Sequence, residues 1–351
     1  GGFVLLLASL TLMFMFSFRL GDMISGVLDG PLDAGRAAIA GLGSGVHIAV
    51  LSGLYDGMVA GAGIVLPYLL PLLFLLAVFE DMGFLPRIAF MADGLLHRVG
   101  LHGKSVIPIV LGYGCNVPGI MATRNLESRR DRVLTMLIVP FIACSARSVV
   151  ILALVGKHIG GLAAGGVYLA NIIITLLLSF LISRFSMKDS PGIIMDVPPL
   201  RRPFFGIVAK KVWLRLYEFL VFTWPVLIVS SVVLAILSGF GIDAVIDRVL
   251  SPLTGTLLHL PVQTGMALFL GFFRKELALV MLGTALGTQD VAAVLSHGQI
   301  LVLVVFTMLY IPCVATVSAI WKEGGARVAL ASVVLNITVA LIVAGALAQL
   351  V

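Results

Sequence analysis

Apolar runs close to the length of a membrane span dominate this sequence. They cover residues 64–79, 167–182, 219–237, 300–320 and 328–350. A hydrocarbon core of roughly 30 Å takes about 20 helical residues, so each run is long enough, or nearly so, to cross it. Only 11% of the residues are charged, against about 25% in soluble domains, and 60% are hydrophobic. A water-soluble fold could not cover so much apolar surface.

The same runs indicate which kind of membrane fold to expect. They lack the alternation over about 10 residues that marks a transmembrane barrel. Helices satisfy every backbone amide within one apolar segment. The sequence therefore predicts an all-α, polytopic integral membrane protein. The net charge of +6 does not indicate a nucleic-acid partner, because the basic residues lie in short loops, where they orient a membrane protein.

The polar segments divide the chain into four expected parts. They are an N-terminal part (1–57), a first repeat (58–183), a basic linker (184–216) and a second repeat (217–351). The N-terminal part is expected to hold one transmembrane helix, 3–18, ended by Arg19, and then an amphipathic surface segment, 20–57. Lys and Arg residues predict that 122–132, 184–215 and 321–327 face the cytoplasm.

Each repeat is expected to hold a span, a broken re-entrant hairpin and two further spans. Residues 106–121 are apolar but carry several prolines and glycines, which disfavour a simple helix. The basic residues on both sides of this segment indicate that the chain enters and leaves on one face. Residues 264–286 repeat the pattern in the opposite direction. Inverted repeats with discontinuous helices are typical of transporters.

The segment 112–124, GYGCNVPGIMATR, carries the chemistry that this architecture would need. Its glycines let the backbone turn and approach a ligand, and Pro118 lacks an amide donor. Cys115 offers a soft sulfur and Asn116 an amide oxygen, a combination suited to a borderline transition-metal ion. Packing of a small buried cysteine is the other interpretation.

This segment resembles the signature of the membrane domain of the ferrous iron transport protein B (FeoB) family. The RRDR cluster at 129–132, CSAR at 144–147 and YIPCVAT at 310–316 are also similar to that family. The resemblance covers nearly the whole chain and implies two inverted gate-type repeats with Fe²⁺ as the transported substrate. It implies that Cys115 and Cys313 line the ion path. The family's GTP-binding domain has no counterpart here, since no GxxxxGK[ST] motif occurs.

Other residues complete the candidate site. Cys144 lies beside a proline at the position that matches Cys313 in the other repeat, and either metal binding or packing explains it. Four charged residues are candidates for gating or ion attraction: Glu80, Asp81, Lys275 and Glu276. For Lys275 and Glu276, a local ion pair that only anchors the hairpin is an equal alternative, because an unpaired charge in the membrane is costly.

The sequence thus predicts a non-enzymatic Fe²⁺ permease of the cytoplasmic (inner) membrane of a prokaryote, without a bound cofactor. Its expected partners are Fe²⁺, the lipid bilayer and a GTP-binding domain, while a homo-oligomer is left open. One alternative is a gate-repeat permease for an organic solute such as a nucleoside, which predicts aromatic and amide residues at both hairpin tips. Another is a membrane anchor or receptor that relays the state of a soluble domain, which needs neither matched cysteines nor broken hairpins.

Overall fold

The computed structural model is helical wherever it describes regular structure. It describes residues 2–41, 46–84, 87, 90, 93, 100–101, 103–185, 202–239, 243–261, 264–273, 282 and 294–350, and no strand occurs in them. Within these residues six helical stretches are long and apolar enough to cross a membrane: 50–81, 129–156, 161–184, 205–233, 297–324 and 326–350. The predicted all-α, polytopic membrane fold is therefore confirmed.

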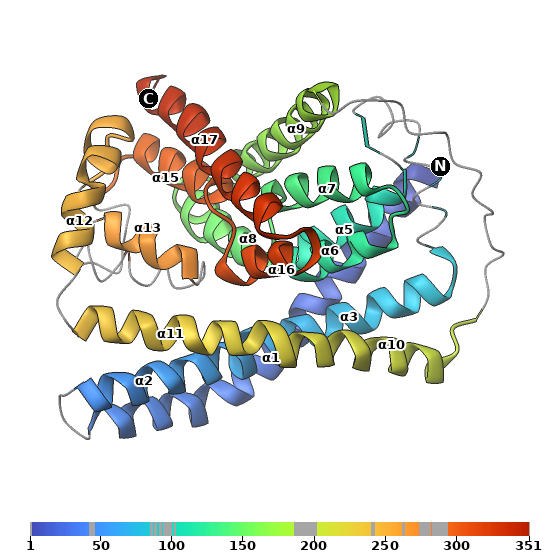
Figure 1. The fold of residues 1–351 in the computed structure, drawn as a ribbon, viewed down its shortest axis with the longest axis horizontal. Coiled ribbons are helices and arrows are strands. Elements are labelled where there is room, and N and C mark those ends of the chain that lie inside the picture. The colour runs from blue at the N-terminus through green and yellow to red at the C-terminus, as the bar shows by residue number, and fades with distance from the viewer. Residues whose placement is uncertain are drawn as a thin grey trace.

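Figure 1 shows two groups of helices, one on each side of the molecule. One is a layer of long helices: α1 (Gly2–Ala40), α2 (Val46–Val59), α3 (Leu66–Asp81), α10 (Phe205–Glu218) and α11 (Trp224–Gly239). In it α2 packs along α11, and α3 packs against both α1 and α10. Short π-helical segments join α2 to α3 and α10 to α11, so each pair forms one continuous helical stretch.

The second group is a bundle that holds the largest buried cluster. Its members are α5 (Val106–Gly114), α6 (Asn116–Ala122), α7 (Arg129–Ile138), α8 (Ser145–Ile151), α9 (Gly161–Phe185), α15 (His297–Leu309), α16 (Val314–Gly324) and α17 (Ala326–Leu350). At its edge lie α12 (Asp243–Ser251) and α13 (Thr264–Phe273). The main core cluster joins residues of α8, α15 and α17, which come from both predicted repeats.

The first predicted hairpin is present. The chain reverses between α5 and α6, because a Cβ on Gly119 would lie only 2.9 Å from the Pro108 carbonyl oxygen, which a continuous helix could not bring so close. Lys104 and Glu127, which flank the hairpin, form an ion pair of 2.6 Å, so the segment begins and ends at the same end of the molecule. The second predicted hairpin, 264–286, lies mostly outside the described residues.

Two boundaries differ from those predicted. Arg19 does not end the first helix, since α1 continues through it to Ala40. The side chain of Arg19 is exposed, so the charged group points away from the helix and the backbone hydrogen bonds continue past it. Helix α10 begins at Phe205, well before the span expected at about 217. The first span, 3–18, lies in α1 and is not among the six candidates.

Candidate functional site

All three cysteines hold the same kind of position, an extended residue directly before a helix. Cys115 precedes α6, Cys144 precedes α8 and Cys313 precedes α16. Each is partly buried, and none of the three forms a disulfide. Breaks of this kind expose backbone groups that a continuous helix would satisfy, and at membrane depth such backbone occurs only where protein buries it or it lines a cavity.

Cys115 and Cys313 lie at the same end of two packed helices. α6 packs against α16, and both cysteines pack against the same buried apolar cluster. At the other ends of these helices, Arg124, which follows α6, forms a two-point ion pair with Glu323 in the last turn of α16, at 2.7 Å and 2.5 Å. The helices therefore run in the same direction with their cysteine ends together.

Asn116 supplies an unused acceptor beside Cys115. Its side chain is 5% exposed, and its Oδ1 atom has no hydrogen-bond partner within the described part of the chain. A buried acceptor without a partner is uncommon and costs free energy. A sulfur and an amide oxygen at one helix break are a donor set suited to a borderline transition metal.

Arg147, in α8, joins the breaks of the two repeats. Its guanidinium donates hydrogen bonds to the carbonyls of Pro140 and Ile142 in the first repeat and to that of Tyr310 in the second. The side chain is 2% exposed. Cys144 and Cys313 both lie within its electrostatic reach, whereas no carboxylate among the described residues does.

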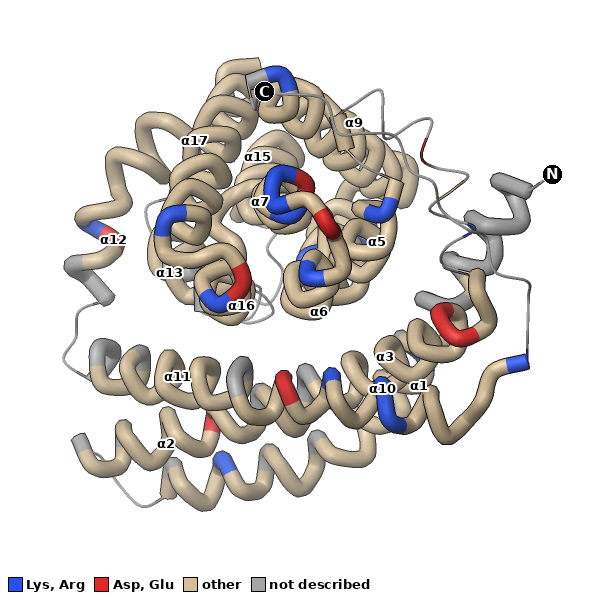
Figure 2. The backbone as a smooth tube through the Cα atoms, turned by 45° about the vertical axis from the view of Figure 1, so that its right-hand side comes forward, with Lys and Arg blue, Asp and Glu red and all other residues tan. Residues whose placement is uncertain are grey.

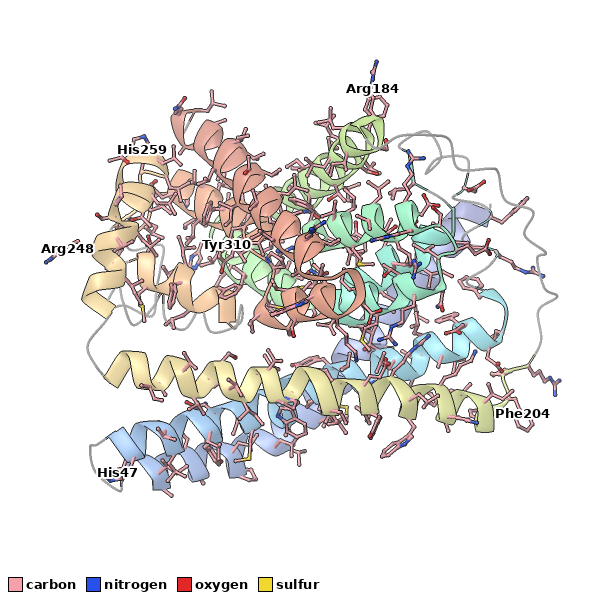
Figure 3. The ribbon with its side chains drawn as sticks, in the orientation of Figure 1. His47, Arg184, Phe204, Arg248, His259 and Tyr310 are labelled. Atoms are coloured by element: carbon pink, nitrogen blue, oxygen red, sulfur yellow. The ribbon has the colours of Figure 1, made fainter. Side chains whose placement is uncertain are left out.

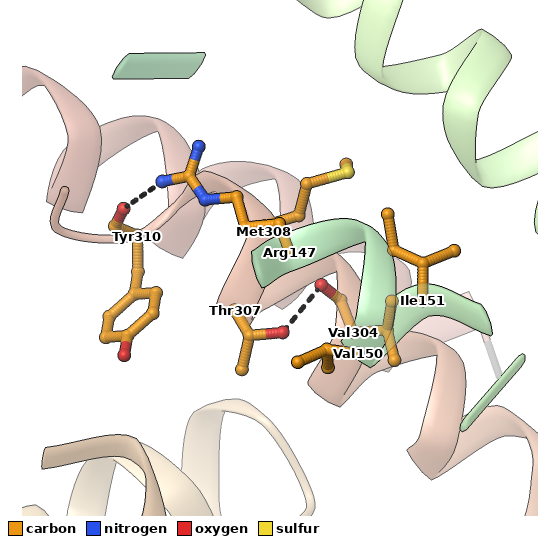
Figure 4. Close-up of a pocket in the computed structure, with 7 residues that line it drawn as sticks. All are labelled: Arg147, Val150, Ile151, Val304, Thr307, Met308 and Tyr310. Atoms are coloured by element: carbon orange, nitrogen blue, oxygen red, sulfur yellow. Dashed lines mark hydrogen bonds between the residues drawn. The ribbon is translucent and has the colours of Figure 1, made fainter. Parts of the chain in front are cut away.

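Figure 4 shows Arg147 among the residues that line a small cavity. The cavity that it lines between α8 and α15 holds only about 10 Å³, close to the minimum for one water molecule. Tyr310 lies inside the molecule in Figure 3, where its hydroxyl donates to the Leu268 carbonyl of α13. This cavity is too small for a hydrated ion.

Asn171, from α9, also secures the first break. Its Nδ2 atom donates to the Phe141 carbonyl at 2.8 Å, and its Oδ1 atom accepts from the Ala143 amide at 3.3 Å. This one buried side chain thus pairs a donor and an acceptor that the break removes from the helix.

Charged residues of α3, α6, α7, α10 and α16 lie at one end of the structure, and others lie elsewhere, on α2 and α12 among other elements (Figure 2). At the first of these places Arg124 pairs with Glu218 of α10, at 2.6 Å, as well as with Glu323. The hydrogen bond to Glu323 raises the pKa of Arg124 above its ordinary value, so the cation keeps its charge. These pairs bring 122–132 and 321–327, two of the segments predicted to be cytoplasmic, to the same end.

The predicted acidic residues at the end of α3 are engaged with α10. Glu80 pairs with Lys211 at 3.2 Å and with Arg215 at 2.7 Å. Asp81 accepts a hydrogen bond from the Phe204 amide. Both carboxylates therefore tether α3 to α10, and their role in ion attraction stays a prediction. Lys275 and Glu276 lie outside the described residues.

A cavity of about 190 Å³ is lined by residues of α3, α6 and α10. Its walls include Leu73, Val117 and Phe219, and its polar end holds Arg124, Arg215 and Glu218. It thus reaches from the charged end of the molecule to the first turn of α6, which follows Cys115.

No group of three or more His, Cys, Asp or Glu residues among the described ones could hold a metal ion. His47 and His259 lie at the periphery of the molecule (Figure 3). The candidate ligands are therefore the cysteines and the amide oxygen of Asn116 rather than a closed multidentate centre.

Sequence reasoning missed the roles of Arg147 and Asn171. Both are polar residues inside otherwise apolar spans, at 129–156 and 161–184. An ionisable or amide side chain within a membrane helix usually faces the protein interior and has a partner there. That rule applied to the two spans would have pointed to both residues, but not to the carbonyls that they bind.

Comparisons with known proteins agree with this architecture. A family model described as "Nucleoside recognition" (Gate) matches 62–158 and 221–327, within the two predicted repeats. A model described as "Ferrous iron transport protein B C terminus" matches 164–215, between the two segments that the Gate model matches. No solved structure matches the chain.

Several curated proteins are similar to the chain. The "Fe(2+) transporter FeoB" of Methanocaldococcus jannaschii is 30% identical over 98% of this chain and 56% of its own length. The protein of the same name from Staphylococcus aureus (strain COL) is 33% identical over 76% of this chain and 44% of its own length. A "Fe(2+) transport protein A/Fe(2+) transporter FeoB fusion protein" of Porphyromonas gingivalis is 36% identical over 68% of this chain and 29% of its own length.

The chain thus spans about half or less of the length of these relatives. The Gate model alone matches more than half of its residues, and the match to the FeoB C-terminal model lies between the two Gate segments. On this evidence the chain belongs to the FeoB family and corresponds to its membrane domain.

Proposed function

We propose that this chain is a permease that moves Fe²⁺ across the cytoplasmic membrane of a prokaryote, between its two Gate repeats. The observation that carries the proposal is the position of Cys115, Cys144 and Cys313, each at a helix break. Thiol and amide ligands suit Fe²⁺, whereas Mg²⁺ and Ca²⁺ prefer hard oxygen ligands. The relatives named as Fe(2+) transporters support the same substrate.

The ion path runs from the charged end through the 190 Å³ cavity toward Cys115 and Asn116. Cys313 joins this site from α16, and Cys144 takes a smaller part. Few protein ligands are needed, because binding must replace some hydration and still allow release. Arg147 repels a divalent cation, which disfavours an ion beside Cys144, three residues before it on the same break.

Coupling to a GTP-binding domain is part of the proposal. The match to the FeoB C-terminal model ends at residue 215, in α10, whose Lys211, Arg215 and Glu218 bind α3 and Arg124. A movement of α10 would therefore be transmitted to both the hairpin and α16. The chain itself acts as a transporter without catalysis, and its oligomeric state is independent of this argument.

Uptake into proteoliposomes tests the function. The purified chain is reconstituted under anaerobic conditions around a fluorescent Fe²⁺ chelator. We expect Fe²⁺ uptake that Mg²⁺ does not compete with. Cys115→Ser and Cys313→Ser should each reduce uptake at least about tenfold, because a lost contact with a charged ligand is worth about 1.5 kcal/mol or more.

Two comparisons make this test decisive. Cys144→Ser is the matched control and should retain more uptake than the other two variants. Labelled nucleoside serves as the second solute, because the Gate model is described by nucleoside recognition. Unchanged Fe²⁺ uptake in both Cys115→Ser and Cys313→Ser would refute the sulfur path. Uptake of nucleoside but not of Fe²⁺ would replace the proposed substrate.

A further inference from the structure

Two oxygen atoms on α17 are buried without a partner. Ser332 and Asn336 are both 0% exposed, and they lie one helical turn apart on the same face. Within the described part of the chain, neither the Ser332 Oγ atom nor the Asn336 Oδ1 atom has a hydrogen-bond partner. The Asn336 Nδ2 atom donates back to the Ser332 carbonyl of its own helix. Unpaired buried polar atoms are few in folded proteins, so this pair calls for a ligand.

The first repeat shows what an asparagine at this place can do. Helices α9 and α17 are both 25 residues long and end their repeats. Asn171 is the eleventh residue of α9, and Asn336 is the eleventh residue of α17. Asn171 uses both ends of its amide on the break of its own repeat. Asn336 is the counterpart of Asn171, but within the described residues its oxygen accepts no hydrogen bond from the backbone of the break.

The two oxygens lie at the level of the second break. Gly325, with φ of 87°, is the one residue between α16 and α17, and the two helices pack together. At 1.5 Å per residue, Asn336 and Cys313 are both roughly 16–18 Å from this turn. Ala329 belongs to the same buried apolar cluster as residues of α16, and Ala340 belongs to the cluster that contains residues of α15. Ser332 and Asn336 therefore lie between the two, where α15 ends and α16 begins.

The break supplies further ligand atoms at that level. The Cys313 sulfur lies 3.1 Å from the Thr316 hydroxyl oxygen, and Thr316 is 0% exposed. Thr316 is three residues after the cysteine, as Arg147 is three residues after Cys144 in the first repeat. The second repeat thus has a hydroxyl where the first has a cation, so the residue at this position does not repel a positive ion.

We propose that Ser332 and Asn336, together with Cys313 and Thr316, form a binding station for the transported divalent cation in the second repeat. The proposal rests on the proposed function and adds a second station, which shares Cys313 with the site at Cys115 and Asn116. Its protein ligands are neutral oxygens and one thiol, so binding is weak enough for release. The nearby guanidinium of Arg147 weakens it further and favours the passage of one ion at a time.

Steady-state uptake of Fe²⁺ by proteoliposomes tests the station. Asn336→Leu removes the amide at similar volume, and Ser332→Ala removes the hydroxyl with little risk to folding. Each should raise the KM for Fe²⁺ about tenfold, as expected for one lost contact with a charged ligand. The thermal midpoint should stay the same or rise, because each change removes a buried polar atom without a partner. Thr338→Val, an exposed change on the same helix, should alter neither quantity.

A charged variant gives an effect of the opposite sign. Asn336→Asp places a carboxylate at the station and should lower the KM for Fe²⁺ while slowing its release. Added Fe²⁺ should also raise the thermal midpoint of this variant more than that of the unmodified chain.

The outcomes separate this proposal from the function on which it rests. If the unmodified chain does not take up Fe²⁺, both fail. If it does, and Asn336→Leu and Ser332→Ala keep its KM, the station fails and the function stands. A lower maximal rate at unchanged KM would assign the two side chains to a conformational step and would also overturn the station.

Discussion

The two helix breaks at the centre of the molecule occupy matching places and are stabilised differently. In the first repeat, Asn171 and Arg147 pair the backbone groups on both sides of the break. In the second repeat, the Tyr310 carbonyl receives its hydrogen bond from Arg147, a residue of the other repeat. The Asn336 oxygen meanwhile has no hydrogen-bond partner among the described residues.

This difference indicates how the two repeats divide their work. A buried polar network with most of its groups paired is rigid, and opening it is costly. In the first break the amide of Asn171 and both terminal nitrogens of Arg147 are paired, while the Arg147 Nε atom has no partner among the described residues. Unpaired groups can gain free energy from a new partner, either an ion or a rearranged backbone. We therefore expect the first break to act as a fixed support and the second to be the one that responds to the ion.

Arg147→Met should have the largest effect on stability. It leaves three buried carbonyls without their donor, and each unpaired buried group costs about 1–3 kcal/mol, so we expect a loss of about 3 kcal/mol or more. Arg147→Lys keeps the charge and part of the hydrogen bonding, and should lose less. Thermal unfolding in detergent measures both. Equal stability of Arg147→Met and the unmodified chain would mean that the guanidinium does not join the two breaks.

Replacing the two matched asparagines compares the repeats directly. Asn171→Leu should destabilise the chain by about 2–4 kcal/mol, because it leaves the Phe141 carbonyl and the Ala143 amide unpaired. Asn336→Leu should be neutral or stabilising, since its oxygen has no partner to lose within the part of the chain that the structure describes. The same unfolding measurement checks the pair. A similar loss in both variants would show that the repeats are not stabilised differently.

The ion pairs at the charged end should have a smaller effect. Arg124→Gln removes the contacts with Glu218 and Glu323, but the Arg124 side chain is 40% exposed. Exposed pairs contribute roughly 0–1 kcal/mol, and salt screens them. We expect a loss of about 1 kcal/mol at low salt that shrinks in 1 M salt. Lys104→Gln, whose partner Glu127 is 85% exposed, is the control and should lose less.

Cys144→Ser should have the smallest effect. The change nearly preserves volume, and the neighbouring break is secured by Asn171 and Arg147 rather than by the sulfur. We expect the unfolding free energy to change by less than about 1 kcal/mol. A larger loss in calorimetric or denaturant unfolding would give the Cys144 sulfur a structural role in the first break.

How much the sequence predicts depends on whether a feature is local. The hairpin at 106–121 follows from prolines and glycines within one apolar run, and the structure contains it. The helix end expected at Arg19 is wrong, because one exposed charge does not interrupt a backbone whose hydrogen bonds are intact. The partners of Arg147 could not be predicted, because the Tyr310 carbonyl is 163 residues away and belongs to the other repeat.

Residue type also limits what the sequence predicts about the site. The cysteines stand out because sulfur ligands are scarce, and the structure places Cys115 and Cys313 on one apolar cluster. Asn171 and Asn336 look alike in the sequence, each in the middle of an apolar helix. Only their surroundings distinguish them. The Asn171 oxygen accepts a hydrogen bond from a backbone amide, whereas the Asn336 oxygen accepts no hydrogen bond from the described residues.

The central claim, that Fe²⁺ passes the cysteines at the helix breaks, is tested most directly by Fe K-edge X-ray absorption of the reconstituted chain with bound Fe²⁺. The account predicts a sulfur shell at about 2.3 Å, a length typical of metal–thiolate bonds. This shell should be lost in the Cys115→Ser/Cys313→Ser double variant and retained in Cys144→Ser. Bound Fe²⁺ with only oxygen or nitrogen neighbours in the unmodified chain would contradict the account.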